Sequence, residues 1–130
     1  LVIALGVDTS GSIGEAELLA FNAECKGIAE SFESYCVYYF QCDARIQDRR
    51  VFENGDAFPV KMKGRGGTSY KPVFEEVEKL EDVSCLVYLT DGYPNDGWPP
   101  PPSVPVLWVL TTDVVPPYGE YVGIQVEEKR

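Results

Sequence analysis

Four segments of the chain are almost continuously apolar, which is typical of strands buried on both faces of a parallel sheet. They are LVIALGV at residues 1–7, SYCVYYFQC at 34–42, SCLVYLT at 84–90 and PVLWVLTT at 105–112. IQDRRVF at 46–52 instead alternates polar and apolar residues, so we expect an edge strand there. YVGIQVE at 121–127 predicts a short closing strand.

Two other segments have the period of an amphipathic helix. In the segment from Gly14 to Phe32, one apolar stripe is predicted from Leu18, Phe21, Cys25, Ile28 and Phe32. The second helix is predicted over residues 71–82, where Val73, Val77 and Leu80 share a face and Pro72 suits the first turn. Residues 92–103, which include four consecutive prolines, predict a stiff loop without a helix.

The alternation of strands and helices predicts the fold class. Strand, helix and strand in succession form right-handed crossovers on one parallel sheet. We therefore expect an α/β, Rossmann-like fold with a mostly parallel central sheet, flanking helices and one antiparallel edge strand. The 130 residues have the length of a single domain, 1–130, with no internal boundary. Because the chain opens on Leu1 and not on Met, we expect it to be a piece of a longer protein.

Charge and composition exclude several classes of function. The net charge is −10, from 21 acidic and 11 basic residues, so nucleic acids and anionic membranes are not expected partners. Histidine is absent, which excludes Ser-His-Asp and Cys-His catalysis and histidine-ligated zinc. The four cysteines form no CxxC pair and are interpreted as buried free thiols, which indicates a cytoplasmic protein. The alternative, a disulfide between two of them, has no positive support in the sequence.

Acidic and hydroxyl side chains collect where buried strands end. Asp8 ends the first strand and is followed by Ser10 and Ser12, and Asp91 ends the strand of residues 84–90. Ligands of open α/β sheets bind at the carboxyl ends of strands. If these two strands are neighbours, both acids meet there, and the glycine-rich loop GRGGTS brings Thr68 to the same edge.

These five side chains offer only oxygen, which suits Mg²⁺, Mn²⁺ or Ca²⁺ rather than Zn²⁺. Each also has a plainer interpretation. Ser12 and Glu15 have the spacing of a helix capping box, Thr68 could cap the second helix, and Asp91 with Gly92 could form a turn. Asp43 ends the strand before the edge strand; it could be a further acid near the site, but a turn-capping role is favoured.

The segments VDTSGSI, GRGGTSYKPVF, LVYLTDGY and PVLWVLTT resemble a von Willebrand factor A (VWA) domain over essentially the whole chain. They resemble most closely the VWA-like domain of bacterial proteins with an upstream metallopeptidase-like region, which implies that this domain is the C-terminal part of a longer protein. The resemblance implies a metal-ion-dependent adhesion site (MIDAS) formed by Asp8, Ser10, Ser12, Thr68 and Asp91. It implies that Mg²⁺, or Mn²⁺ or Ca²⁺, is held there and accepts an acidic side chain from a partner. The proline-rich loop departs from larger relatives, which place a helix between these strands, so the fold is a trimmed one.

The expected function is therefore a divalent-metal-dependent protein-binding module and not an enzyme. Its partner would be a protein that offers Asp or Glu; by the resemblance, this could be an AAA+ ATPase or the upstream region of the same protein. Two alternatives stay open: a metal-assisted hydrolase using Asp8 and Asp91, and a structural domain whose metal site has lapsed.

Basic residues cluster around the glycine-rich loop despite the acidic balance of the chain. Four of the 11 basic residues fall within KMKGRGGTSYK at 61–71. A solvated loop explains such a cluster, but it also predicts a positive rim, formed by Lys63, Arg65 and Lys71, that attracts an acidic partner.

Overall fold

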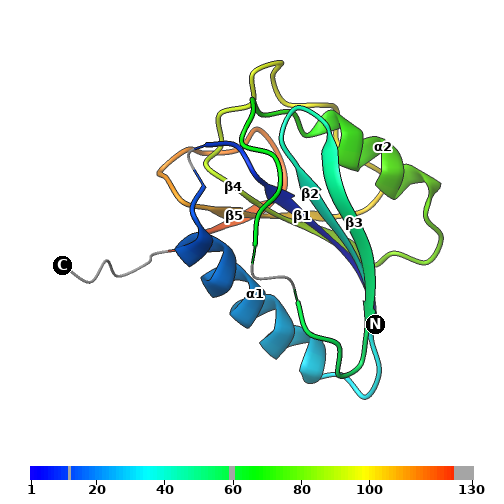
Figure 1. Ribbon diagram of the computed structural model, residues 1–130. Coiled ribbons are helices and arrows are strands. Elements are labelled where there is room, and N and C mark those ends of the chain that lie inside the picture. Colours follow the sequence, from blue (N-terminus) through cyan, green and yellow to red (C-terminus); the bar gives the residue numbers. More distant parts are fainter. Residues whose placement is uncertain (12, 59–60, 125–130) are drawn as a thin grey trace.

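The computed structural model describes residues 1–11, 13–58 and 61–124, which form a sheet with one helix on each face (Figure 1). The six strands are β1 (Val2–Asp8), β2 (Cys36–Cys42), β3 (Ile46–Glu53), β4 (Cys85–Thr90), β5 (Val106–Leu110) and β6 (Glu120–Gly123). The helices are α1 (Glu15–Glu30) and α2 (Lys71–Lys79). Residues 91–105 contain no helix or strand, as the proline-rich sequence predicted.

The strand order of the sheet is β3-β2-β1-β4-β5-β6. Among the strands of the described residues, only the β2–β3 pair is antiparallel, and β3 forms one edge of the sheet. The predicted fold class and the antiparallel edge strand are therefore confirmed. β1 lies between β2 and β4, which makes it a neighbour of both. From β1 the chain adds β2 and β3 on one side, and it then adds β4, β5 and β6 on the other side. The direction in which strands are added therefore reverses between β1 and β4.

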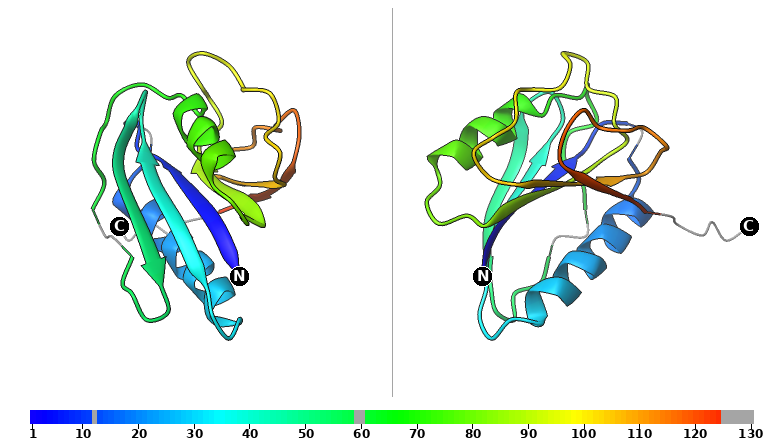
Figure 2. Two further views of the ribbon diagram at one scale, coloured as in Figure 1. Left: turned by 90° about the vertical axis from the view of Figure 1, so that its right-hand side faces the viewer. Right: turned by 180° about the vertical axis from the view of Figure 1, so that it is seen from behind.

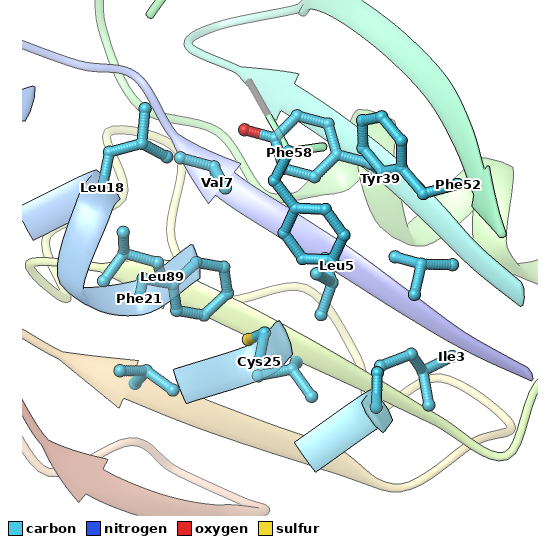
Figure 3. Packing of buried hydrophobic residues seen from close by; sticks show 14 of the residues in the cluster. Ile3, Leu5, Val7, Leu18, Phe21, Cys25, Tyr39, Phe52, Phe58 and Leu89 are labelled. Atoms are coloured by element: carbon cyan, nitrogen blue, oxygen red, sulfur yellow. The ribbon is translucent and has the colours of Figure 1, made fainter. Parts of the chain in front are cut away.

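Two apolar cores result because successive residues of a strand point to opposite faces. On one face, Ile3, Leu5 and Val7 of β1 pack with Leu18 and Phe21 of α1 (Figure 3). On the other face, α2 covers a cluster of aromatic rings made of Tyr70, Phe74, Tyr88, Trp98, Trp108 and Tyr118. Figure 2 shows the two helices on opposite sides of the sheet.

A glycine in β1 makes room for one of these rings. Gly6 is the register partner of Tyr88 in β4, and a Cβ atom at Gly6 would lie 2.6 Å from two ring carbons of Tyr88. This separation is shorter than van der Waals contact, so the ring occupies the space that a side chain at position 6 would need.

The predicted buried stripe of the first helix is correct only in its first half. Leu18, Phe21 and Cys25 are buried, but Ile28 is 53% and Phe32 47% exposed, and α1 ends at Glu30. Ala29 packs on the sheet instead. Ile28 follows Cys25 by three residues and Ala29 follows it by four. Both spacings continue an apolar helix face, so the sequence alone does not show which of the two residues is buried.

Both predicted helix caps are also wrong. The N-cap of α1 is Gly14, and Glu17 is the glutamate whose carboxylate accepts the Gly14 amide at 3.1 Å, where the sequence suggested Ser12 and Glu15. The N-cap of α2 is Tyr70 rather than Thr68. In both cases the loop before the helix is two residues longer than the capping pattern implied, because its residues make contacts at the end of the sheet.

Candidate functional site

The candidate site lies at the carboxyl ends of β1 and β4, where three loops meet. Val7 of β1 is the register partner of Leu89 of β4, so the next residues, Asp8 and Thr90, end the two parallel strands side by side. The loop after β1 leads to α1, the loop after β4 starts with Asp91, and the glycine-rich loop arrives from β3. Open α/β sheets bind ligands at this position, outside the carboxyl ends of the strands where the strand order reverses.

Asp8 is fully buried and is held by neutral hydrogen-bond donors. Its Oδ1 accepts the amide of Ser10 at 2.8 Å, and its Oδ2 accepts the hydroxyl of Thr90 at 2.7 Å. Burial raises the pKa of Asp8; hydrogen bonds from Ser10 and Thr90 oppose this change, and the nearby charge of Asp91 adds to it. The site therefore holds a carboxylate whose negative charge is costly without a cation.

A chain of hydroxyl groups connects Asp8 to the aromatic core. The Thr90 hydroxyl lies 2.8 Å from the hydroxyl of Tyr70, and both side chains are fully buried. Because Thr90 uses its single hydroxyl proton on Asp8, Tyr70 must donate to Thr90. The amide of Gly92 donates to the same Thr90 oxygen at 3.2 Å.

The second acid, Asp91, follows β4 directly and is partly exposed. Its Oδ1 accepts the amide of Tyr93 at 3.2 Å, and its carbonyl oxygen accepts the Thr112 hydroxyl at 2.5 Å. These bonds fix the turn after β4, as the turn interpretation of Asp91 and Gly92 expected. They also keep the carboxylate close enough to Asp8 for the two charges to interact.

Thr68 is buried in the glycine-rich loop, which is bonded to the loop after β4. The amide of Thr68 donates to Oδ1 of Asn95 at 2.6 Å, and the amide of Asn95 donates to the carbonyl of Thr68 at 2.8 Å. The neighbouring Ser69 hydroxyl donates to Asp96 at 2.8 Å. Asn95 is thus a positioning residue that the sequence analysis missed, because one asparagine in a loop carries no distinguishing signal.

Asp43 anchors the other end of the glycine-rich loop. Its Oδ1 accepts Nε2 of Gln47 at 3.0 Å and the amide of Arg45 at 3.2 Å, and its Oδ2 accepts the amide of Gly66 at 3.0 Å. Burial alone would raise the pKa of Asp43, but these hydrogen bonds outweigh it and lower the pKa. Asp43 therefore has the turn-capping role expected from the sequence, and it also fastens the loop that carries Thr68.

The three residues of the predicted rim have different surroundings. Nζ of Lys63 lies 3.8 Å from Asp48, and Nζ of Lys71 lies 3.8 Å from Asp96; both lysines are more than half exposed. Arg65 differs, because its guanidinium donates to backbone carbonyls of the loop after β1. The three basic residues are thus not equivalent, which charge along the sequence could not show.

Of the five predicted metal ligands, four lie at this end of the sheet: Asp8, Ser10, Thr68 and Asp91. Ser12 lies outside the described residues. Within the described part of the chain, no group of three or more His, Cys, Asp or Glu residues is placed to share a metal ion. The predicted site has only two acids, so hydroxyl groups and water would have to supply the other oxygens. Such a donor set fits a hard cation, and binding of one stays a prediction.

In the described ranges, neither helix has the length and apolar character needed to cross a membrane.

Comparison with known proteins places the chain in a family. An uncharacterised protein of Thermotoga maritima is 30% identical over 91 residues, which are 70% of this chain but only 23% of that relative. The crystal structure of the ArnB paralog VWA2 from Sulfolobus acidocaldarius is similar in fold, with a TM-score of 0.62 and 16% identity. That match covers 84% of this chain and 34% of the other. Residues 3–125 match the VWA-like domain (DUF2201), and the chain therefore belongs to this VWA-like family.

Proposed function

We propose that this chain is a protein-binding module that depends on a divalent cation. The observation that supports the proposal is the fully buried Asp8 carboxylate, held by an amide and a hydroxyl and lying beside a second acid, Asp91. A buried carboxylate close to a second, partly exposed acid destabilises the fold unless a cation or a proton neutralises it. The VWA-like fold supports the same proposal.

The cation would be Mg²⁺, with Mn²⁺ or Ca²⁺ as alternatives. Asp8, Ser10, Ser12, Thr68 and Asp91 would hold it, the hydroxyls directly and the acids directly or through water. Hydroxyl and water ligands carry no charge, so a divalent cation held mainly by them keeps affinity for one further anionic oxygen. A partner's Asp or Glu side chain would complete the coordination.

The partner is proposed by resemblance to VWA proteins: an AAA+ ATPase, or an upstream region of the same protein, in the cytoplasm. The chain spans less than a quarter of the Thermotoga maritima relative, so the activity of a whole protein would involve segments beyond this domain. We propose no catalytic role for this domain, since every side chain at the site can be explained by holding loops or a cation.

Calorimetric titration of the chain with Mg²⁺ and Mn²⁺ tests the proposal. We expect one binding site in the wild type, and loss of at least 90% of the affinity in Asp8→Asn and Asp91→Asn. Asp113→Asn is the matched control, because Asp113 is an exposed aspartate on the loop after β5 and loses the same charge. Equal effects of all three substitutions would indicate a nonspecific electrostatic effect and contradict the assigned ligands.

A second measurement separates the alternatives. If the wild type binds neither cation, the domain is structural and its metal site has lapsed. If it binds Mg²⁺ and also hydrolyses generic phosphoester or peptide substrates in an Asp8-dependent way, it is a metal-assisted hydrolase. A binding module should bind the cation, show no turnover, and retain an acidic partner protein in Mg²⁺ but not in chelator.

A further inference from the structure

Arg65 connects the glycine-rich loop to the loop after β1 through three hydrogen bonds. Its Nη1 donates to the carbonyl of Ile13 at 2.8 Å, and its Nη2 donates to the carbonyl of Gly11 at 3.3 Å. Its backbone amide donates to the carbonyl of Thr9 at 2.9 Å. A single residue therefore holds three carbonyl groups of segment 9–13, the segment that carries Ser10.

The backbone at Arg65 also indicates that its position is imposed by the fold. Its φ angle is 90°, in the left-handed region that residues with a Cβ atom rarely adopt, and it follows Gly64 with a φ angle of 123°. Such a conformation persists only where surrounding contacts compensate for it, and it tends to occur at functional sites. Here the compensating contacts are the three bonds to segment 9–13.

A positive charge at this place works against cation binding by simple electrostatics, because like charges repel. A guanidinium near a metal site would be retained there only if its geometry helps more than its charge harms. The planar fork of arginine can reach two carbonyl oxygens at once, which a lysine ammonium cannot do with the same geometry.

We propose that Arg65 is a positioning residue that fixes segment 9–13 in the conformation required for cation binding. This inference rests on the proposed function, and it replaces the role of Arg65 in a rim for an acidic partner. By holding the carbonyls of Gly11 and Ile13, Arg65 aligns the backbone next to Ser10 before the cation binds. Removal of a residue that holds metal ligands in place without touching the metal typically weakens metal affinity 10–100-fold.

The test compares Arg65→Gln, Arg65→Lys and Lys61→Gln with the wild type in the complete 130-residue chain. Lys61 is the control, because it is exposed, lies on the same loop and carries the same charge. Two quantities are measured: the affinity for Mg²⁺ and Mn²⁺ by calorimetry, and amide hydrogen exchange of segment 9–13 without metal. Exchange in β1 and β2 reports whether each variant remains folded.

The positioning role and a pure charge effect predict opposite changes in the cation affinity of Arg65→Gln. If Arg65 acts by positioning, both Arg65 variants bind the cations about 10-fold more weakly and exchange faster in segment 9–13, while Lys61→Gln matches the wild type. If only charge matters, Arg65→Gln binds the cations more tightly than the wild type and Arg65→Lys is unchanged. Either of those results, or unchanged exchange in segment 9–13 of Arg65→Gln, would overturn the proposal.

Failure of the proposed function gives a different result. In that case the wild type binds no cation, and the exchange measurement alone decides whether Arg65 holds the segment. A variant whose amides also exchange faster in β1 and β2 is globally destabilised. Arg65→Gly, which adopts the left-handed backbone conformation without strain, then replaces that variant in the calorimetry and the hydrogen exchange.

Discussion

Replacing Thr90 by valine should destabilise the protein strongly, although the two side chains have almost the same shape. The Thr90 hydroxyl donates to Asp8, accepts from Tyr70 and accepts from the amide of Gly92, all in a buried place. Valine can make none of these bonds. Thr90→Val therefore removes one bond to a carboxylate and leaves a buried hydroxyl and a buried amide without an acceptor.

The expected loss can be estimated bond by bond. The bond to the Asp8 carboxylate contributes about 2 kcal/mol, since hydrogen bonds to charged groups are the stronger class. The buried Tyr70 hydroxyl without an acceptor costs about 1 kcal/mol, and the longer Gly92 bond about 0.5 kcal/mol. The extra methyl group of valine returns somewhat less than 1 kcal/mol. We expect a net decrease of about 3 kcal/mol in the free energy of unfolding.

Urea unfolding followed by circular dichroism measures this change, which should lower the midpoint by about 2 M. Tyr70→Phe removes only the terminal hydroxyl of the chain and should cost about 1 kcal/mol. In the double variant, position 70 carries no hydroxyl that would lack an acceptor. The loss of stability should therefore be about 1 kcal/mol smaller than the sum of the losses in the two single variants. A Thr90→Val loss below 1 kcal/mol, or strictly additive losses, would refute the hydroxyl chain.

Three further predictions concern the loops and the core. Asp43→Asn should lower stability by about 2 kcal/mol at pH 7. Hydrogen bonds lower the pKa of Asp43 from 3.8 in the folded protein, so its contribution to stability is present above 3.8 and is lost as the pH falls through the folded pKa. The difference between the urea midpoints of variant and wild type should therefore shrink as the pH is lowered below 3.8. Gly6→Ala should lower the free energy of unfolding by about 2 kcal/mol, because the new methyl group overlaps the buried ring of Tyr88. Gly27→Ala, which has open space around it in α1, should raise it by about 0.5 kcal/mol, and thermal unfolding compares the two variants. Burial raises the pKa of Cys25 and Cys42 to about 12, so mass spectrometry should find both unmodified after brief alkylation at pH 8 and modified once urea is added.

Each of these three predictions has an outcome that would contradict it. A stability difference for Asp43→Asn that does not change with pH would show that its carboxylate is not held in the ionised form. Equal melting temperatures for the two glycine variants would show that the sheet adjusts around position 6. Rapid alkylation of the native protein would show that its core opens readily.

The order of elements could be predicted from the sequence because apolar runs and helical periods are local properties. Asp8 and Asp91 were predicted at one edge because parallel strands place their ends together, and β1 and β4 are indeed neighbours. The contacts that support the site could not be predicted in this way. Tyr70 and Thr90 are 20 residues apart, and Arg65 and Gly11 are 54 apart, so only the tertiary fold determines that they meet.

Local ambiguity explains the remaining differences. Ser12, Glu15 and Glu17 all fit capping patterns, and the loop contacts decide that the helix starts at Glu15. In the same way, counting basic residues gave Arg65 the same role as Lys63, whereas the planar guanidinium binds back onto the protein. Charge can be read from a sequence, but the direction in which a long side chain points depends on which acceptors the fold places nearby.

The two tryptophans of the chain give the protein a built-in optical probe. Trp98 and Trp108 lie with ring centroids 4.8 Å apart, and Tyr70 contacts both rings while its hydroxyl reaches Thr90. Tyrosine can transfer excitation to indole over such short separations, and indole emission responds to small changes in its surroundings. Any event that moves Asp8 should therefore alter the intrinsic fluorescence, so cation binding at the proposed site should be measurable in the unlabelled protein.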